Sequence, residues 1–385
     1  MQLSRRAVSI GLLSLPATIG LSSMRAFAAD DVLRNTADVA REKAKLPGLA
    51  MLVARHGSIL EQMAVGVRAR GGTEPVTTDD HWHIGSCGKA FTATLIARQV
   101  ENGLIHWNMP LAVLLPELAS QMHPQAAKIT LYELLTMRAG LPANPVNGGT
   151  AAGIIKGLRI LQTLADDDRS RRQVIAARAL AEPPKKVPGS AFSYSNTGYV
   201  LLGAIAERAG NDSYDRLVAR EIFEPLQITD YGFGAPGSGP GIDQPRGHQP
   251  RADGSALAPG DPSADLPSFM RPAGGIHMSL AAWHRFVAEH IGGERGTGVL
   301  LKQETYARLH ARPGAAFPYA GGWGASSKPL RLLTHVGNNT LWTAWVEAYP
   351  DSGMIFLFAS NDGRDAASMS AFQTLRAELT QKYPI

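Results

Sequence analysis

The chain of 385 residues has an ordinary globular composition, with 44% hydrophobic and 18% charged residues and a formal net charge of +5. This length supplies enough apolar side chains for one large domain or two smaller ones. No apolar run in the body of the chain is long enough for a transmembrane helix, and no dense cluster of Lys and Arg indicates a nucleic-acid-binding surface. The single cysteine, Cys87, excludes an internal disulfide bond and a cysteine-based structural zinc site.

Residues 1–28 differ from the rest of the chain and have the pattern of a secretory signal peptide. Arg5 and Arg6 precede a mildly apolar stretch, and the residues AFA before Ala29 form a small-x-small cleavage pattern. Cleavage there would remove three arginines and no acidic residue, which lowers the net charge from +5 to +2. The sequence therefore predicts a protein exported to the periplasm or secreted, and the paired arginines favour the twin-arginine route.

The first predicted elements of the mature chain, 29–385, are strands followed by helices. Residues 48–69 read as two strands rich in Val, Leu, Met and Ala, joined by a turn at RHGS. A helix is expected over 86–102, where small residues on one face predict close packing in the centre of the protein. Another is expected over 129–140, with a threonine as N-cap and a glycine at its end.

The middle of the chain is predominantly helical. Residues 151–182 are expected to form two helices broken near the DDD run, followed by helices over 196–210 and 213–227. Residues 232–267 are dense in Gly and Pro, which predicts a long irregular loop that overhangs a cleft. A helix near 279–291 follows this loop.

The last part of the chain returns to strands. Segments 330–337, 341–350 and 353–361 have apolar or alternating patterns, and a PDSG turn joins the last two into a hairpin. The order of the elements predicts one antiparallel sheet built from about 45–80 and 265–385. The helical segment of about 86–230 is then an insertion into this sheet domain.

The segment HWHIGSCGKAFTATLI, which begins at His81, holds several reactive side chains. His81 and His83 would lie on one face of a strand and could chelate a metal, but no third ligand is near, which favours a solvated or hydrogen-bonded pair and no metal. Cys87 lacks a partner histidine, so a buried apolar role is expected.

Ser86 and Lys89 are three residues apart at a helix start and therefore lie on one face, one turn apart. A serine becomes nucleophilic when a base removes its proton, and a lysine is such a base when burial or a nearby cation lowers its pKa. The alternative is an N-cap serine followed by a surface lysine. The pair alone does not decide between the two.

Two further patterns support the catalytic interpretation. Tyr194 and Asn196 belong to a Y-S-N sequence before a helix, and His335 and Gly337 belong to an H-V-G sequence on a predicted strand. Ser-x-x-Lys, Tyr-x-Asn and [Lys/His]-x-Gly, in this order, are similar to the three motifs of the serine β-lactamases and penicillin-binding proteins. Taken alone, the tyrosine could be a core residue, the asparagine a helix N-cap and the histidine a solvent-facing strand residue.

The chain resembles the class C β-lactamase-related serine hydrolases, which include D-Ala-D-Ala carboxypeptidases, D-aminopeptidases and short-chain esterases. The resemblance spans about residues 45–363. It is carried by the three motifs and by the segments ITLYELLTMRAGLP, PGSAFSYSNTGYVLLGAIAERAG and RPAGGIHMSLAAWHRFV. It implies an α/β (α+β) fold of the β-lactamase/transpeptidase type, with an antiparallel sheet flanked by helices and an inserted helical domain. It also implies a reaction without metal or organic cofactor.

The resemblance also implies roles for individual residues. Ser86 is the expected nucleophile, and Lys89 and Tyr194 share the general-base work, with a cationic lysine lowering the pKa of the tyrosine. Asn196 orients the substrate or the lysine. Gly337 belongs to the third motif, whose His335 places the substrate and polarises the tyrosine.

Backbone N–H groups of Ser86 and Asn338 are expected to hold the oxyanion. Four tryptophans are candidates for the pocket wall or for the core: Trp82, Trp323, Trp342 and Trp345.

One departure from the family pattern bears on the substrate. The third motif begins with His335 where β-lactamases of this family usually have Lys, and a histidine is mostly neutral at pH 7. The sequence therefore favours a hydrolase of small esters or amides, of the esterase or D-amino-acid peptidase type. The alternatives are a β-lactamase, a penicillin- or peptide-binding protein that acylates without turnover, and a transesterase. The expected partner is a small ester, amide or β-lactam, with no nucleic acid and no membrane span after signal cleavage; the sequence indicates no oligomeric state.

Overall fold

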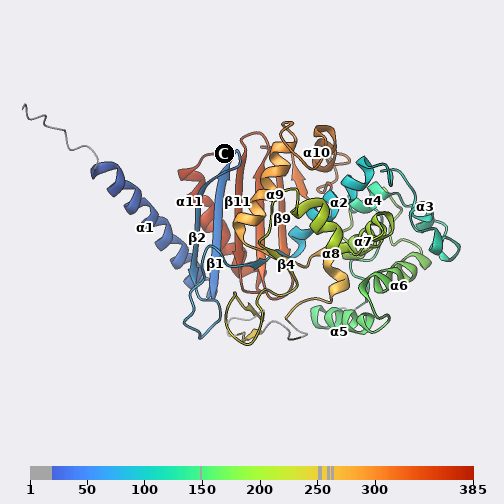
Figure 1. The fold of residues 1–385 in the computed structure, drawn as a ribbon, viewed down its shortest axis with the longest axis horizontal. Helices are drawn as coiled ribbons and strands as arrows, with labels where there is room; N and C mark the ends of the chain where they lie inside the picture. Colours follow the sequence, from blue (N-terminus) through green and yellow to red (C-terminus); the bar gives the residue numbers. More distant parts are fainter. Residues whose placement is uncertain (1–19, 148–149, 250–253, 258–260, 262–263) are drawn as a thin grey trace, which may run out of the picture.

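The computed structural model describes all residues except 1–19, 148–149, 250–253, 258–260 and 262–263. Most of the predicted signal peptide therefore lies outside the described residues. Residues 20–28 begin the helix α1 (Gly20–Lys43), whose first half projects from the body of the protein in Figure 1. None of the helices in the described ranges combines the length and hydrophobicity that crossing a bilayer requires.

A six-stranded sheet with antiparallel pairing forms one half of the protein (Figure 1). Its strand order is β2-β1-β11-β10-β9-β8. The strands are β1 (Gly48–Arg55), β2 (Ser58–Gly66), β8 (Gly324–Ser326), β9 (Leu332–Asn338), β10 (Thr343–Tyr349) and β11 (Met354–Ser360). The β1–β2 hairpin turns through His56 and Gly57, both with positive φ, as a two-residue hairpin turn of matching twist requires. The first and last strands of the chain thus pair in the middle of the sheet.

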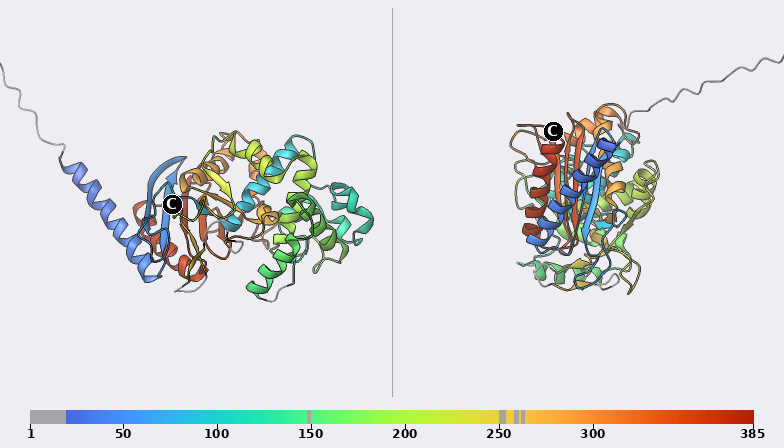
Figure 2. Two further views of the ribbon diagram at one scale, coloured as in Figure 1. Left: turned by 60° about the horizontal axis from the view of Figure 1, so that its bottom comes forward. Right: turned by 90° about the vertical axis from the view of Figure 1, so that its left-hand side faces the viewer.

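Helices cover both faces of this sheet. On one face, α1 and α11 (Asp365–Lys382) lie side by side (Figure 2), and Leu33 and Phe372 join a core with the apolar side chains of β1 and β11. On the other face, α9 (Leu280–Gly293) packs on β1 and β11 and belongs to the larger core, which continues into the helical half. Because both faces are covered, β10 and β11 are buried along their whole length.

The helical half is assembled around α2 (Lys89–Glu101) and α7 (Asn196–Gly210), which pack against each other. Lys89 and every residue from Ala90 to Ala97 are buried, as the small residues of this segment predict. The other α-helices are α3 (Leu111–Leu114), α4 (Leu131–Leu135), α5 (Ala151–Gln162), α6 (Asp168–Ala181), α8 (Tyr214–Val218) and α10 (Gln303–His310). Short 3₁₀ helices are η1 (Gly85–Gly88), η2 (Pro116–Gln121), η3 (Ala126–Lys128) and η5 (Ser268–Ala273), and η4 (Ala219–Phe223) is a π-helical turn.

Short strands connect the two halves. A small sheet has the order β3-β7-β4, built from β3 (Trp82–His83), β7 (Ile276–Met278) and β4 (Tyr231–Phe233). It holds the chain that enters η1 against the chain that leaves η5. A two-stranded ladder of β5 (Gly247–His248) and β6 (Ala256–Leu257) lies within the long loop.

This architecture confirms the predicted fold class, an antiparallel sheet flanked by helices with a mostly helical insertion. Helix starts agree where a capping residue marks them, as at Thr130 before α4 and Asp167 before α6. The end predicted at Gly140 is wrong, because α4 already ends at Leu135. The predicted helix over 213–227 is instead α8 followed by a π-helical turn. The sequence did not predict α10 or β8.

Candidate active site

A tight turn presents Ser86 at the junction of the two halves. The predicted helix over 86–102 begins instead as the 3₁₀ turn η1, and α2 starts only at Lys89. Gly85 has φ +51°, and a Cβ there would lie 2.5 Å from the backbone nitrogen of Asn338. Only glycine fits such a close backbone approach. Strand β9 is therefore held directly against the turn that carries the serine.

Lys89 is completely buried and points at this serine. Its Nζ lies 2.9 Å from Ser86 Oγ, and it also donates a hydrogen bond to the carbonyl oxygen of Ala273. No ion pair joins it to a carboxylate within the described residues. Burial therefore lowers the pKa of Lys89 to about 7. A neutral amine that donates to Ala273 keeps its lone pair for the hydroxyl proton of Ser86.

Tyr194 lies beside the pair but has a different charge state from the one predicted. The Lys89 Nζ is 5.0 Å from the centre of the tyrosine ring. Burial raises the pKa of Tyr194 above its ordinary value, and a hydrogen bond with Ser86 opposes this only in part. The expectation that a cationic lysine lowers the pKa of this tyrosine is therefore wrong, because burial removes water from the phenol. Lys89 is the better base, and Tyr194 remains a protonated hydroxyl.

Asn196 is fixed by the segment that precedes α5. Its Nδ2 donates to Asn144 Oδ1 at 2.8 Å, and its backbone N–H donates to Ala143 O at 2.7 Å. It does not hydrogen-bond Lys89, which was one predicted role. The N-cap of α7 is Ser195, whose Oγ accepts from the N–H of Gly198. The amide of Asn196 is thus held by another amide at the start of α7.

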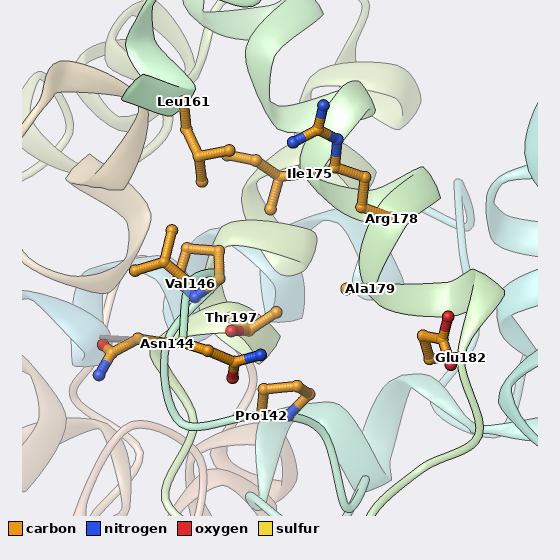
Figure 3. A pocket seen from close by; sticks show the side chains of 11 residues that line it. Pro142, Asn144, Val146, Leu161, Ile175, Arg178, Ala179, Glu182 and Thr197 are labelled. Atoms are coloured by element: carbon orange, nitrogen blue, oxygen red, sulfur yellow. The ribbon is translucent and has the colours of Figure 1, made fainter. Parts of the chain in front are cut away.

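A pocket opens on the far side of Asn144 (Figure 3). It has a volume of about 170 Å³ and lies between residues 142–147, α5, α6 and the first turn of α7. Most of its wall is apolar, and Leu161 and Ile175 stand opposite Thr197. Thr197 is fully buried, and its Oγ1 has no hydrogen-bond partner within the described residues. Asn144 therefore lines this pocket and also holds the side chain of Asn196.

His335 of β9 is buried beside the tyrosine but does not hydrogen-bond it. Its ring centre lies 6.2 Å from that of Tyr194, while its Nε2 lies 3.2 Å from the hydroxyl of Tyr319. Burial, with the nearby positive charge of Lys89, lowers the pKa of His335 to about 3. The predicted polarisation of Tyr194 by His335 is therefore wrong, and the imidazole is neutral at pH 7. The sequence predicted a mostly neutral histidine, and burial is the main reason that His335 is neutral.

Gly337 and Asn338 form the part of β9 that faces the serine turn. A side chain at Gly337 would overlap the carbonyl oxygen of Ile84, so glycine is required there. The side chain of Asn338 turns away, with its Nδ2 donating to Gly363 O at 3.2 Å and to Asp365 Oδ1 at 2.5 Å. Only the backbone of Asn338 approaches the nucleophile turn, as its predicted oxyanion role requires.

His81 and His83, which precede the turn that carries Ser86, make contacts that connect separate segments of the fold. His83 Nδ1 accepts from the N–H of Gly85 at 3.0 Å, and its Nε2 lies 3.3 Å from Asp265 Oδ1. His81 pairs with Asp230. No group of three or more His, Cys, Asp or Glu suited to a metal occurs in the described part of the chain. Cys87 is buried, with its Sγ 3.4 Å from His335 O, so it packs the turn against β9.

The four tryptophans, which were candidates for the pocket wall or for the core, lie in the core. All are at most 8% exposed: Trp82, Trp323, Trp342 and Trp345. In the loop 232–267, His248 is buried and its Nδ1 lies 2.6 Å from Asn361 O, which fastens the loop to the end of β11. Parts of this loop lie outside the described residues, and its overhang of the cleft stays a prediction.

Three contacts of this site were missed in the sequence: those of Asn144, Ala273 and Tyr319. Each lies more than 15 residues from the group that it binds. Asn144 follows a GLP sequence after α4, and Tyr319 precedes a GGW sequence, but neither pattern indicates a partner. Only the fold brings these residues to the motifs.

Comparison with protein families supplies an independent view. The family described as Beta-lactamase matches residues 33–380, which is most of the chain. Penicillin-binding protein 4 of Amycolatopsis lactamdurans is 32% identical over 193 residues, covering 50% of this chain and 46% of that protein. Esterase EstB of Burkholderia gladioli is 29% identical over 201 residues, covering 51% of this chain and 49% of that protein. The chain spans about half the length of these curated relatives.

Solved structures agree in fold. The D-amino acid amidase of Ochrobactrum anthropi SV3 superposes with a TM-score of 0.72 at 20% identity, covering 92% of this chain and 99% of that one. The class C beta lactamase of Rhodobacter sphaeroides superposes with a TM-score of 0.68 at 21% identity, covering 90% of this chain and 99% of that one. At this level of identity the likeness shows the shared fold alone.

Proposed function

The chain belongs to the β-lactamase family of serine hydrolases, and from this premise we propose that it hydrolyses small esters or amides through an acyl-enzyme on Ser86. The expected activity is that of an esterase or a D-amino-acid peptidase. The observation that carries the proposal is the fully buried Lys89 amine, 2.9 Å from Ser86 Oγ and without a carboxylate partner in the described structure. Such an amine is a base at neutral pH.

Acylation follows from these contacts. The lone pair of Lys89 takes the hydroxyl proton as Ser86 Oγ bonds to the substrate carbonyl carbon. The proton then passes to the leaving group through the hydroxyl of Tyr194, which is hydrogen-bonded to Ser86 and remains protonated in its buried position. The bond from the carbonyl carbon to the leaving group breaks, and water later hydrolyses the ester on Ser86 by the reverse proton path.

The backbone N–H groups of Ser86 and Asn338 would stabilise the developing oxyanion. The turn holding Ser86 and the segment Gly337–Asn338 pack backbone against backbone, and a Cβ on Gly85 would lie 2.5 Å from the nitrogen of Asn338. Loss of one such donor costs about 10²–10³ in rate in enzymes of this kind. Asn196, fixed by Asn144, would then orient the carbonyl side of the substrate.

The state of His335 supports an esterase or peptidase over a β-lactamase. β-Lactams carry a carboxylate, and a lysine in the third motif would supply its counter-charge. Here the histidine is neutral and faces Tyr319. The names of the similar proteins include an esterase and an amidase, which agrees with this substrate class. A β-lactamase and a binding protein that acylates without turnover are the alternatives.

The test compares an activated short-chain ester with a chromogenic cephalosporin, using the wild type and Ser86→Ala. We expect turnover of the ester, little or no turnover of the cephalosporin and a loss of at least about 10³ in the variant. A cephalosporin that is the better substrate would make the protein a β-lactamase. A burst of one equivalent without turnover would indicate the binding protein. Equal rates for the wild type and Ser86→Ala would show that Ser86 is not the nucleophile.

We also propose export of the protein, on the evidence of the first 28 residues alone. The basic pair, the apolar stretch and the AFA sequence before Ala29 support it. Expression of the full chain with fractionation and N-terminal sequencing tests this: the exported form should begin at Ala29. Replacement of Arg5 and Arg6 by lysine should retain the protein in the cytoplasm if the twin-arginine route is used.

A further inference from the structure

One carboxylate from the long loop 232–267 reaches the back of the active site. Asp265 Oδ1 accepts hydrogen bonds from Leu266 N–H at 2.7 Å and from Asn339 Nδ2 at 2.9 Å, and His83 Nε2 lies 3.3 Å from the same oxygen. His83 and Asn339 are each 1% exposed. Burial alone would raise the pKa of Asp265, but these contacts, with His83 first, lower it, so the carboxylate is ionised at pH 7.

The contact with Gly85 fixes the proton on the His83 ring. Nδ1 accepts from the backbone N–H of Gly85 at 3.0 Å, and a backbone N–H can only donate. The ring is therefore neutral with its proton on Nε2, and this N–H faces the carboxylate of Asp265. Its alignment is outside the range of a regular hydrogen bond, so the contact is electrostatic, between an N–H dipole and an anion.

On the nucleophile side, His83 acts on the turn that presents Ser86. Its Nδ1 holds the N–H of Gly85, the residue before the serine, which has φ +51°. A change in this φ would turn the backbone N–H of Ser86, which is one of the two proposed oxyanion donors. The histidine ring is itself held by Trp342, which stacks on it with ring centres 5.6 Å apart.

On the strand side, Asn339 acts on the segment that carries the other proposed donor, the N–H of Asn338. Asn339 Oδ1 accepts from the N–H groups of Leu341 and Trp342 at 3.2 and 3.1 Å, so its side chain closes the turn between β9 and β10. Its Nδ2 is bound to Asp265. The carboxylate therefore fixes the position of this turn relative to the loop.

We propose that Asp265 is a positioning residue that aligns the two oxyanion donors: through His83 and Asn339 it joins the serine turn to the end of β9. The two segments meet where a Cβ on Gly85 would lie 2.5 Å from the nitrogen of Asn338, so a small separation there would misdirect both donors. This inference rests on the proposed hydrolase function. None of the contacts of Asp265 in the described structure is with the nucleophile or the base, so it acts through its two partners.

The test compares two variants of this residue in the hydrolysis of 4-nitrophenyl acetate. Asp265→Ala removes both contacts, so kcat should fall about 30-fold while KM stays within about threefold, because the donors act mainly in the transition state. Asp265→Asn keeps an acceptor oxygen for both partners, and Gly85 N–H still fixes the proton on the histidine. Its kcat should therefore stay within about threefold of the wild type.

Asp243→Ala is the matched control. It removes an exposed carboxylate of the same loop that accepts from the N–H and the hydroxyl of Ser238 and has no contact with His83 or Asn339 among the described residues. Its kcat should equal that of the wild type. A loss in Asp243→Ala as large as in Asp265→Ala would show a general effect of the loop and would overturn the inference.

A transition-state analogue separates positioning from a partial loss of folding. Phenylboronic acid forms a tetrahedral adduct with a serine hydroxyl and directs an oxygen toward the oxyanion donors. Its Ki should rise about 30-fold in Asp265→Ala, in proportion to the fall in kcat, and should stay within about threefold in Asp265→Asn. A smaller folded fraction would lower the observed rate and leave the Ki unchanged.

Unchanged kcat and Ki in folded Asp265→Ala would contradict the inference, as would an equal loss in Asp265→Asn. A measurement on the wild type needs no variant of Asp265 to fold: ¹⁵N shifts of the His83 ring, assigned with His83→Gln, should show a proton on Nε2 and none on Nδ1 at pH 7. A proton on Nδ1 would overturn the arrangement. If the wild type hydrolyses a cephalosporin and not the ester, the proposed substrate class fails, and the same ratios measured on the cephalosporin decide the role of Asp265.

Discussion

Two buried polar clusters are attached to the same helix, α2, and they differ in how their charge is balanced. At the start of the helix, the amine of Lys89 has a hydroxyl and a backbone carbonyl as its partners. Further along, the hydroxyl of Thr94 lies 3.0 Å from His290 Nε2, and His290 Nδ1 lies 2.8 Å from His310 Nε2. The second cluster continues beyond these histidines to an ion pair.

That ion pair lies at the outer end of the histidine cluster. His310 Nδ1 contacts Glu294, which also pairs with Arg331. These partners lower the pKa of Glu294 to about 2 although burial alone would raise it. Arg331 continues to Asp351 at 3.3 Å. Every charge in this cluster has a counter-charge.

The comparison shows that burial alone does not distinguish a reactive group from a structural one. A buried charge with a counter-charge is a stable connection between elements, here between α2, α9 and α10. A buried amine without a counter-charge loses its proton near neutral pH and becomes a base. The two clusters should therefore respond oppositely to mutation.

The largest effect is expected for Lys89→Met, which keeps an unbranched chain up to the position of Cε and removes the amine that acts as the base. We expect kcat/KM on an activated ester to fall by about 10³ or more. The free energy of unfolding should stay the same or rise, because a buried amine without a counter-charge is replaced by an apolar chain. Steady-state kinetics and urea denaturation measure the two quantities, and Thr94→Val serves as the control on the same helix. A large loss of stability with retained activity would contradict the comparison.

The pH dependence tests the same group without mutation. The base must be unprotonated, so kcat/KM should rise about tenfold per pH unit below about 7 and level off above it. At pH 5 the rate constant should be about a hundredfold below its plateau. If kcat/KM does not change between pH 5 and 7, the catalytic base is a group other than Lys89.

The same pKa shift predicts a change in stability. The folded state releases the Lys89 proton near pH 7 and the unfolded state near its ordinary pKa of 10.5. Between these values the unfolded state binds more protons, so the contribution of this group to stability increases with pH across that window. The free energy of unfolding of the wild type, taken relative to Lys89→Met, should rise from pH 7 to pH 10. A decrease over this range would contradict the assignment.

In the histidine cluster the expected effects are reversed. His310→Gln removes a ring that joins His290 to Glu294, and we expect a loss of about 3 kcal/mol in the free energy of unfolding. The kcat on the ester should remain within about twofold, because this cluster does not contact Ser86 or Lys89. Denaturation curves and kinetics on the same preparations decide this, with exposed His106→Gln as a control. A large fall in kcat in a folded variant would link the two clusters functionally.

The smallest effect is expected at the pocket behind Asn144. Thr197→Val replaces an unpartnered buried hydroxyl by a methyl group of the same shape. The free energy of unfolding should be unchanged or up to about 1 kcal/mol higher, since no hydrogen bond is lost. A loss above about 1 kcal/mol in thermal or urea unfolding would show that the hydroxyl has a bound partner in solution.

Much of the fold could be read from local patterns. The β1–β2 hairpin, the caps of α4 and α6 and the PDSG hairpin all depend on residues within a few positions of each other. The 24-residue α1 and the short β8 escaped prediction, because their stability comes from packing on α11 and from pairing with β9. Local propensity carries little information about such contacts.

The candidate site divides in the same way. Ser86 in η1 and Lys89 at the start of α2 are three residues apart, and residues at this spacing share one side of a helical turn. The sequence by itself therefore determined that these two groups would meet. Whether the lysine would be a cation or a base was decided by the tertiary structure, which buries it without a carboxylate partner. The partners of Asn196 and His335 were decided there too, because Asn144 and Tyr319 reach them only through the packing of distant segments. Hydrogen bonds and desolvation depend on what surrounds a group in space, and that environment exists only once the chain has folded.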